Sequence, residues 1–148
     1  MNTSTTIGAG LLQNVRTGHF QRTLAGLTAG GAVVTTLEIY VSHDSASFGN
    51  KLMWIPIAVV PTLVPAGIAA VCNERAARVV LPIASALVVA NGLQGTYLHL
   101  RGVAQKPGGL KMAAYNFEMG PPVLAPLITT LVGGMGLLAS VLRRENSL

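Results

Sequence analysis

The sequence predicts an all-α polytopic membrane protein, a bundle of four transmembrane helices. Hydrophobic residues make up 51% of the 148 residues and charged residues 10%, whereas about a quarter of a typical soluble domain is charged. The apolar residues gather in four runs, which cover residues 24–41, 52–72, 79–100 and 122–142. Each run is long enough to cross a bilayer core of ~30 Å. A soluble bundle would show a polar face along each helix, and these runs have almost none.

An arm and a tail flank this predicted domain, which covers residues 24–142. Residues 1–23 form the N-terminal arm and residues 143–148 the tail. A short amphipathic helix on the membrane surface is expected within the arm, from the spacing of Ile7, Leu11, Leu12 and Val15.

Positive charge near the ends of the spans predicts the orientation. Six Lys and Arg residues lie on the side of the two termini, against four on the opposite side. The six are Arg16, Arg22, Arg75, Arg78, Arg143 and Arg144, and the four are Lys51, Arg101, Lys106 and Lys111. Because cytoplasmic loops carry the excess of positive residues, both termini are predicted to be cytoplasmic.

Two segments are expected to depart from regular transmembrane helix. Pro61 and Pro65 each remove a backbone donor inside the second run, which predicts a kinked or locally unwound helix. The connection 101–121 turns at Pro107-Gly108-Gly109 and then places apolar residues on one face. We therefore expect a short interfacial helix or cap there, covering the open end of the bundle.

Several classes of activity are excluded by the residues present. Cys72 is the only cysteine, so the chain forms no intrachain disulfide and does no chemistry with a cysteine pair. The sequence contains no P-loop, no GxSxG motif and no cysteine–histidine cluster with zinc-site spacing. The net charge of +5 is spread over the loops, which predicts contact with the bilayer and not with nucleic acid. We expect no catalytic activity from the chain alone.

Polar and aromatic residues gather at one end of the predicted bundle, the end with the 42–52 and 101–121 connections. All three tyrosines and the only tryptophan lie there, with two of three histidines and three of five acids. Interfacial Tyr and Trp are expected at both membrane faces, so this asymmetry indicates a functional surface. Its members are Glu38, Tyr40, His43, Asp44, Trp54, Tyr97, His99, Arg101, Tyr115, Asn116 and Glu118.

His99 lies above a stripe of mostly small residues on the third run. The stripe consists of Gly95, Gly92, Val88 and Ser85, and small residues of this kind can admit a flat macrocycle against a helix. Asn91 and Gln94 lie deeper in the same helix, and we expect them to face protein and to join helices by hydrogen bonds.

A cofactor site is therefore predicted from His99, His43, Tyr97, Arg101 and Glu38. The histidines would ligate a haem iron or hydrogen-bond a quinone, Glu38 would carry a proton, and Arg101 would set the local potential. A non-haem metal on the histidines and acids is an alternative, and the sequence does not identify a metal. The structural alternative is a close helix contact under a histidine that hydrogen-bonds Glu38 or Glu118.

The run "GTYLHLRGVAQKPGG…YNFEMGPPVLAP" resembles a family of uncharacterised bacterial four-helix membrane proteins. The resemblance covers roughly residues 90–130. It implies a location in the bacterial inner membrane, and it carries no activity to transfer.

Three functions remain open from the sequence. The first is a small accessory or anchor subunit of a larger membrane complex in electron transport, which would bind the bilayer and other membrane subunits. The second is a quinone- or haem-binding redox module with its site at the 42–52/101–121 face. The third is a small homo-oligomeric transporter with the kinked helix as a gate, although a mid-bilayer ionisable residue is lacking.

Overall fold

The computed structural model describes residues 9–10, 13 and 19–142. The residues that carry the predicted amphipathic helix of the arm, and the tail 143–148, lie outside the described residues. Among the described residues all regular structure is helical, and four helices are long and apolar enough to cross a membrane. The prediction of an all-α fold with four such helices is thus confirmed.

The four long helices are built from eight elements. The first is α2 (His19–Ser45). The second, Lys51–Cys72, consists of the 3₁₀ turn η1 (Lys51–Met53), α3 (Trp54–Val59), the 3₁₀ turn η2 (Val60–Thr62) and α4 (Leu63–Cys72). The third, Ala76–Ala104, joins the π-helical turn η3 (Ala76–Val80) to α5 (Leu81–Ala104), and the fourth is α7 (Leu124–Val141). They contain 27, 22, 29 and 18 residues.

Prolines explain two local features of these helices. Pro61 lies in η2, so the second helix is irregular in its middle as predicted, and the Thr62 hydroxyl donates to the Val59 carbonyl at 2.6 Å. The fourth helix begins at Leu124 and not at residue 122 as predicted. Pro121 and Pro122 precede it, and a residue before proline is disfavoured in helical conformation.

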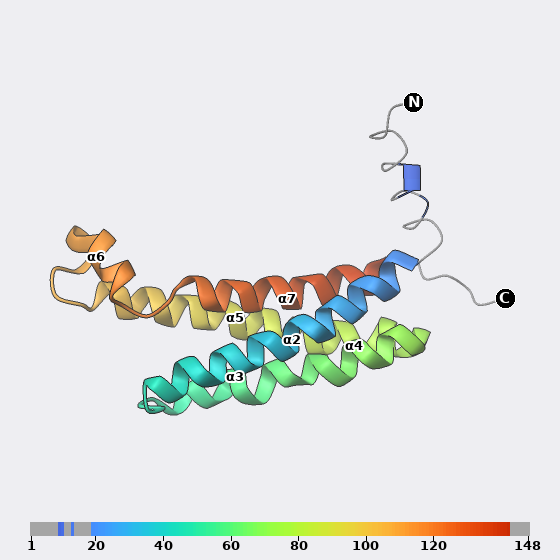
Figure 1. Cartoon of the computed structure of the whole chain (residues 1–148), viewed down its shortest axis with the longest axis horizontal. Helices are drawn as coiled ribbons and strands as arrows, with labels where there is room; N and C mark the ends of the chain where they lie inside the picture. The colour runs from blue at the N-terminus through green and yellow to red at the C-terminus, as the bar shows by residue number, and fades with distance from the viewer. Residues whose placement is uncertain (1–8, 11–12, 14–18, 143–148) are drawn as a thin grey trace.

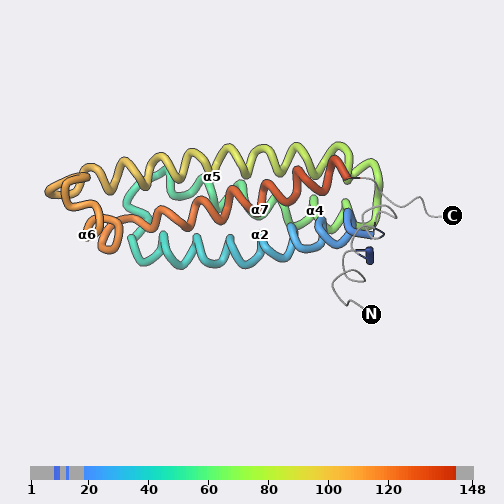
Figure 2. Tube along the Cα trace, turned by 90° about the horizontal axis from the view of Figure 1, so that it is seen from above, coloured from blue at the N-terminus to red at the C-terminus, as the bar shows by residue number. Residues whose placement is uncertain are grey.

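The helices form two pairs, α2 with α3–α4 and α5 with α7 (Figure 1). The view from above shows that α7 also lies alongside α2 (Figure 2). We call the end that carries residues 46–50 and 105–123 the histidine end. At the opposite end, Nη1 of Arg78 donates to the Ser140 carbonyl at 2.9 Å and ties the third helix to the end of α7.

Glycine permits close contacts within each pair. A Cβ at Gly67 would lie 2.7 Å from the Ala25 carbonyl oxygen, and a Cβ at Gly92 would lie 2.8 Å from the Thr130 backbone nitrogen. Real side chains do not approach backbone atoms so closely. Glycine at these two positions therefore sets the helix spacing, in the manner of small-residue contacts between membrane helices.

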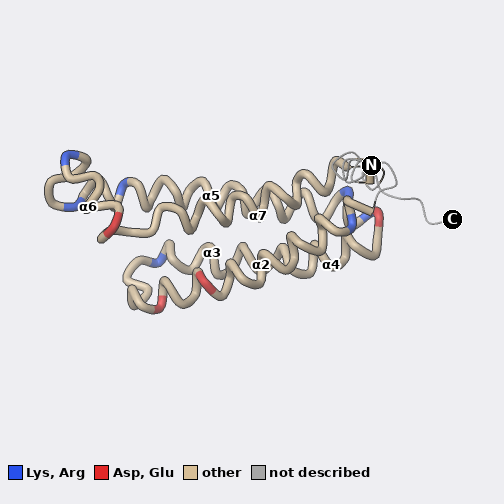
Figure 3. The backbone as a smooth tube through the Cα atoms, turned by 45° about the horizontal axis from the view of Figure 1, so that its top comes forward, with Lys and Arg blue, Asp and Glu red and all other residues tan. Residues whose placement is uncertain are grey.

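The outward faces of the long helices are apolar. Val34 is 69% exposed and Leu131 is 68% exposed, and many other large hydrophobic residues share this orientation. Lys, Arg, Asp and Glu lie toward the two ends of the bundle (Figure 3). An apolar belt between two charged ends is typical of a helix bundle in a bilayer.

The connection after α5 contains the predicted short helix. The chain turns at Gly108, whose φ of +78° favours glycine, and continues into η4 (Gly109–Met112) and α6 (Ala113–Glu118). The buried Asn116 amide donates to the carbonyls of Pro107 and Gly109 at 3.1 and 2.8 Å, which holds the turn together. Figure 1 shows α6 beyond the ends of α5 and α7.

Candidate functional site

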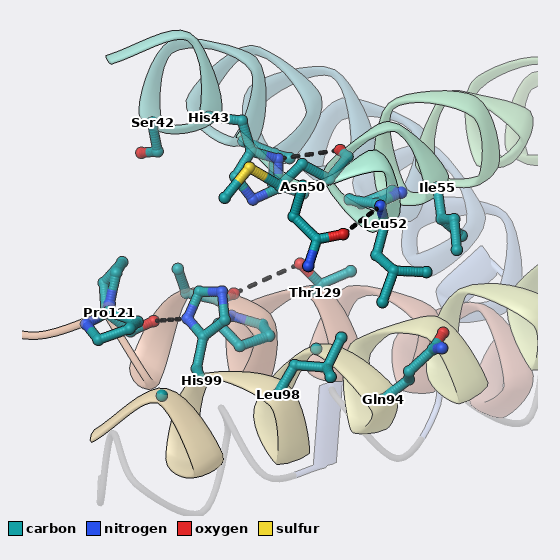
Figure 4. Close-up of a pocket in the computed structure, with 18 of the residues that line it drawn as sticks. Ser42, His43, Asn50, Leu52, Ile55, Gln94, Leu98, His99, Pro121 and Thr129 are labelled. Carbon is teal, nitrogen blue, oxygen red and sulfur yellow. Dashed lines mark hydrogen bonds between the residues drawn. The ribbon is translucent and has the colours of Figure 1, made fainter. Parts of the chain in front are cut away.

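A pocket lies at the histidine end, between the two pairs of helices (Figure 4). Its volume is about 710 Å³, within the range of ~300–1,000 Å³ of small-molecule sites. One wall comes from the end of α2 with η1 and α3, and the other from α5 and the start of α7. The lining includes Ile39, His43, Leu52, Ile55, Asn91 and His99.

His43 is half-buried near the end of α2. Its Nδ1 lies 3.0 Å from the carbonyl oxygen of Met53, at the start of the second helix. The imidazole also meets the Phe48 ring edge-on, with the centroids 6.2 Å apart. These two contacts orient the ring toward the pocket.

The turn after α2 supports this orientation. Ser47 and Phe48 have φ angles of +55° and +46°, in the left-handed region that a bulky residue such as Phe rarely adopts. Phe48 is held there by stacking on Trp54, with ring centroids 4.2 Å apart, and by contact with Tyr40. The strained turn thus brings an aromatic cluster against His43.

His99 is fixed in the same manner on the opposite wall. Its Nδ1 lies 2.8 Å from the carbonyl oxygen of Pro122, just before α7. Gly95 and Gly102, one turn away on either side, face Pro126 and Pro121, so the chain around the start of α7 approaches α5 closely. This close approach places the Pro122 carbonyl within reach of the imidazole.

The two hydrogen bonds determine the tautomer of each ring. A backbone carbonyl only accepts hydrogen bonds, so Nδ1 of His43 and Nδ1 of His99 carry the proton. A neutral ring in this state keeps a lone pair on Nε2, which can accept a hydrogen bond or bind a metal. Figure 4 shows the two imidazoles on opposite sides of the pocket.

Two further predicted residues, Glu38 and Arg101, line the same pocket from opposite walls. Both are exposed, and the Glu38 carboxylate accepts a hydrogen bond from Ser42 at 2.9 Å. Opposite charges therefore stand at the pocket on its two walls. Among the described residues no cluster of three His, Cys, Asp or Glu side chains is suited to hold a metal ion.

Tyr97 does not belong to the pocket, contrary to the prediction. Its side chain is 62% exposed and does not line the cavity. Tyr97 is two residues from His99, and helix positions two apart do not face each other. The prediction grouped residues by their level along the helix and did not separate the helix faces.

The stripe of small residues below His99 is occupied by α7. Gly92 packs against Thr130, Gly95 against Pro126, and Ser85 against Gly136. The predicted groove for a macrocycle is thus filled by a neighbouring helix, which agrees with the alternative of a close helix contact under His99. The other part of that alternative is wrong, because His99 bonds the Pro122 carbonyl and not Glu38 or Glu118.

Asn91 and Gln94 differ from the expectation as well. Both line the pocket, and the described structure gives neither side-chain amide a hydrogen bond to another helix.

The short helix predicted to cap the bundle differs in position from the prediction. None of the lining residues lies between 106 and 119, so α6 leaves the end of the pocket uncovered.

Two acceptors that fix the site, the carbonyls of Met53 and Pro122, were not predicted. A backbone carbonyl carries no residue-type signal, and Pro122 lies 23 residues from His99. Thr129, a buried hydroxyl on α7 that lines the pocket, was missed because it reads as an ordinary helix residue.

The resemblance of residues 90–130 to bacterial four-helix membrane proteins stays a prediction. Comparisons with protein-family models, with curated proteins and with solved structures find no match for this chain.

Proposed function

We propose that the chain is a small integral-membrane subunit that binds a quinone-class redox ligand in the pocket between its helix pairs. The observation that carries the proposal is the pair of imidazoles, His43 and His99, on opposite walls of one cavity. Each has Nδ1 engaged by a backbone carbonyl and Nε2 left for a ligand. Histidines that hold ligands through one nitrogen are commonly oriented in this way through the other.

The chemistry of the pocket suits a quinone-class headgroup. A neutral Nε2 accepts a hydrogen bond from a phenolic hydroxyl, and the imidazolium form donates one to a carbonyl. Ile39, Leu52 and Ile55 supply an apolar surface for the flat ring. A haem has less support, because α7 fills the small-residue stripe below His99 on which a macrocycle would lie.

A larger membrane complex is part of the proposal. The pocket is uncovered at its outer end, and the adjacent segment exposes large apolar side chains beyond the long helices, namely Leu110, Met112, Tyr115, Phe117 and Met119. We infer that a partner subunit of an electron-transport complex docks here, in the bacterial inner membrane with both chain termini cytoplasmic. On a native gel, Tyr115→Lys should separate the chain from the band with quinol-oxidising activity. Glu74→Lys, at an exposed position at the opposite end of the bundle, should not.

The ligand is tested by identifying what purifies with the protein in mild detergent. Solvent extraction followed by chromatography should recover a quinone from the wild type and from Tyr97→Ala, whose side chain points away from the pocket. His99→Ala should reduce the recovered quinone at least about tenfold while the protein stays monodisperse, and His43→Ala provides a second test. A haem absorption band lost in His99→Ala would contradict the choice of quinone, and no bound ligand in any variant would contradict the function.

A further inference from the structure

Two side-chain amides that line the pocket have no hydrogen-bond partner in the described structure. Asn91 and Gln94 both line the cavity from α5. Asn91 lies near the centre of the Ala76–Ala104 helix and is the α5 lining residue farthest from the uncovered outer end of the pocket. An amide without a hydrogen bond in the deep part of a cavity carries a free-energy penalty. A ligand that bonds this amide would remove the penalty.

The spacing of Asn91 and His99 fits a ring with two oxygens. The residues are eight positions apart on one helix, which corresponds to about 12 Å along its axis. A six-membered ring with two opposite oxygens, each hydrogen-bonded, spans about 11 Å. A ring of this size would lie along α5, with Leu98 of that helix and Ile55 of the opposite wall on its apolar faces.

The two ends of this arrangement have different hydrogen-bonding properties. Nε2 of His99 only accepts while its ring is neutral, because the proton is on Nδ1. The Asn91 amide both donates and accepts, so it can pair with either a hydroxyl or a carbonyl. At the His99 end, a ligand hydroxyl can therefore donate to Nε2. A ligand carbonyl has no proton to donate, so its lone pairs would face the lone pair of Nε2.

We propose that the pocket selects the reduced, quinol form of its ligand, with one hydroxyl donating to Nε2 of His99 and the second oxygen held by the amide of Asn91. Gln94, one turn away on the same wall, supports this second position. The inference rests on the proposed function and adds to it the redox form of the ligand and the residue that binds its far oxygen.

The test is equilibrium binding of three probes to the full-length protein in lipid nanodiscs at pH 7.5. The probes are a decyl-substituted benzoquinol kept anaerobic, the corresponding benzoquinone, and the quinol with one hydroxyl converted to a methyl ether. Calorimetry gives Kd for the wild type, Asn91→Leu, and the control Ala90→Leu, which places the same new side chain at an exposed position outside the pocket.

The expected result is that the wild type binds the quinol about tenfold or more tightly than the quinone. Asn91→Leu should weaken quinol binding about tenfold, and Ala90→Leu should leave it unchanged. The methyl ether should bind the wild type more weakly than the quinol does, and this difference should shrink in Asn91→Leu. Gln94→Leu, at an exposed position, should weaken quinol binding less than Asn91→Leu does. It is an independent test that the ligand contacts the α5 wall of the pocket.

Three outcomes would overturn the inference in distinguishable ways. Equal quinol affinity of the wild type and Asn91→Leu, with binding lost in His99→Ala, removes the role of Asn91 and leaves the proposed function standing. A quinone affinity equal to or above the quinol affinity removes the selection of the reduced form. Absence of binding by all three probes contradicts the proposed function itself.

Discussion

His43 and His99 are held by the same kind of hydrogen bond, from Nδ1 to a backbone carbonyl, on opposite walls of one pocket. His43 donates Nδ1–H to the carbonyl of Met53, and His99 donates Nδ1–H to the carbonyl of Pro122. In each case a histidine near the end of one helix is bonded to the residue that leads into its partner helix. The orientation of each ring is thereby linked to the packing of its own helix pair.

The tautomers provide the first prediction. In the ligand-free protein, we expect the neutral form of both imidazoles to carry its proton on Nδ1, because the carbonyl partners accept and do not donate. The ¹⁵N chemical shifts of the imidazoles in selectively labelled protein report the tautomer directly. A neutral population with its proton on Nε2 in either ring would show that the carbonyl contact is not formed in solution.

The second prediction concerns a close contact between α5 and α7. Gly92→Ala should lower the free energy of unfolding by about 1–3 kcal/mol, because the new Cβ meets the Thr130 nitrogen and the Pro126 carbonyl oxygen, both backbone atoms. Gly134→Ala is the matched control, since no atom lies within 4 Å of a Cβ there. It should be neutral or stabilising by up to about 1 kcal/mol.

Denaturant titration in detergent, followed by Trp54 fluorescence, measures both glycine variants. Equal stabilities of Gly92→Ala and Gly134→Ala would mean that α5 and α7 are farther apart than the structure has them.

The third prediction concerns the opposite end of the bundle. Arg78→Ala removes the hydrogen bond from Nη1 to the Ser140 carbonyl and should cost about 0.5–1.5 kcal/mol, near the lower bound because the arginine is exposed. Arg75→Ala, also exposed, removes the same charge without that contact. A difference in melting temperature between the two variants measures the hydrogen bond. Equal melting temperatures would assign the effect to charge alone.

Cys72 allows the orientation to be tested without disturbing the fold. It is the only cysteine, it is exposed, and it ends the second long helix at the end of the bundle opposite the histidine end. With the proposed inner-membrane location and orientation, a membrane-impermeant maleimide should label it in inverted inner-membrane vesicles and not in intact spheroplasts. Lys106→Cys in a Cys72→Ser background should give the reverse pattern, and labelling of Cys72 in spheroplasts would contradict the proposed orientation.

The fold was predictable because each spanning helix is specified by a long apolar run within one continuous segment of sequence. An apolar run of about 20 residues specifies a spanning helix whatever it packs against. The irregular turn at Pro61 follows from a missing donor within that helix. The starting residue of α7 was less certain, because consecutive prolines suit both the last residues of a loop and the first turn of a helix.

The site was predictable only in part. The clustering of His43, His99, Glu38 and Arg101 at one end follows from topology, which brings alternate helix ends together. Which of these side chains share a cavity depends on helix rotation, and for that reason the predicted set includes Tyr97, which does not line the pocket. The small-residue stripe indicates that something packs closely against this helix face. It does not specify that α7 of the same chain, and not a cofactor, packs there.

The unequal lengths of the long helices link the pocket to bilayer thickness. At 1.5 Å per residue, the 29-residue third helix is about 43 Å long and the 18-residue α7 about 27 Å, around a hydrocarbon core of ~30 Å. The third helix extends past its apolar run at both ends, where Arg78 and Arg101 lie. The apolar α7 is shorter than the core, and such hydrophobic mismatch is relieved by thinning the lipid around the helix. Since the third helix carries His99 and the chain entering α7 carries its carbonyl partner, we expect lipid acyl-chain length to alter ligand affinity.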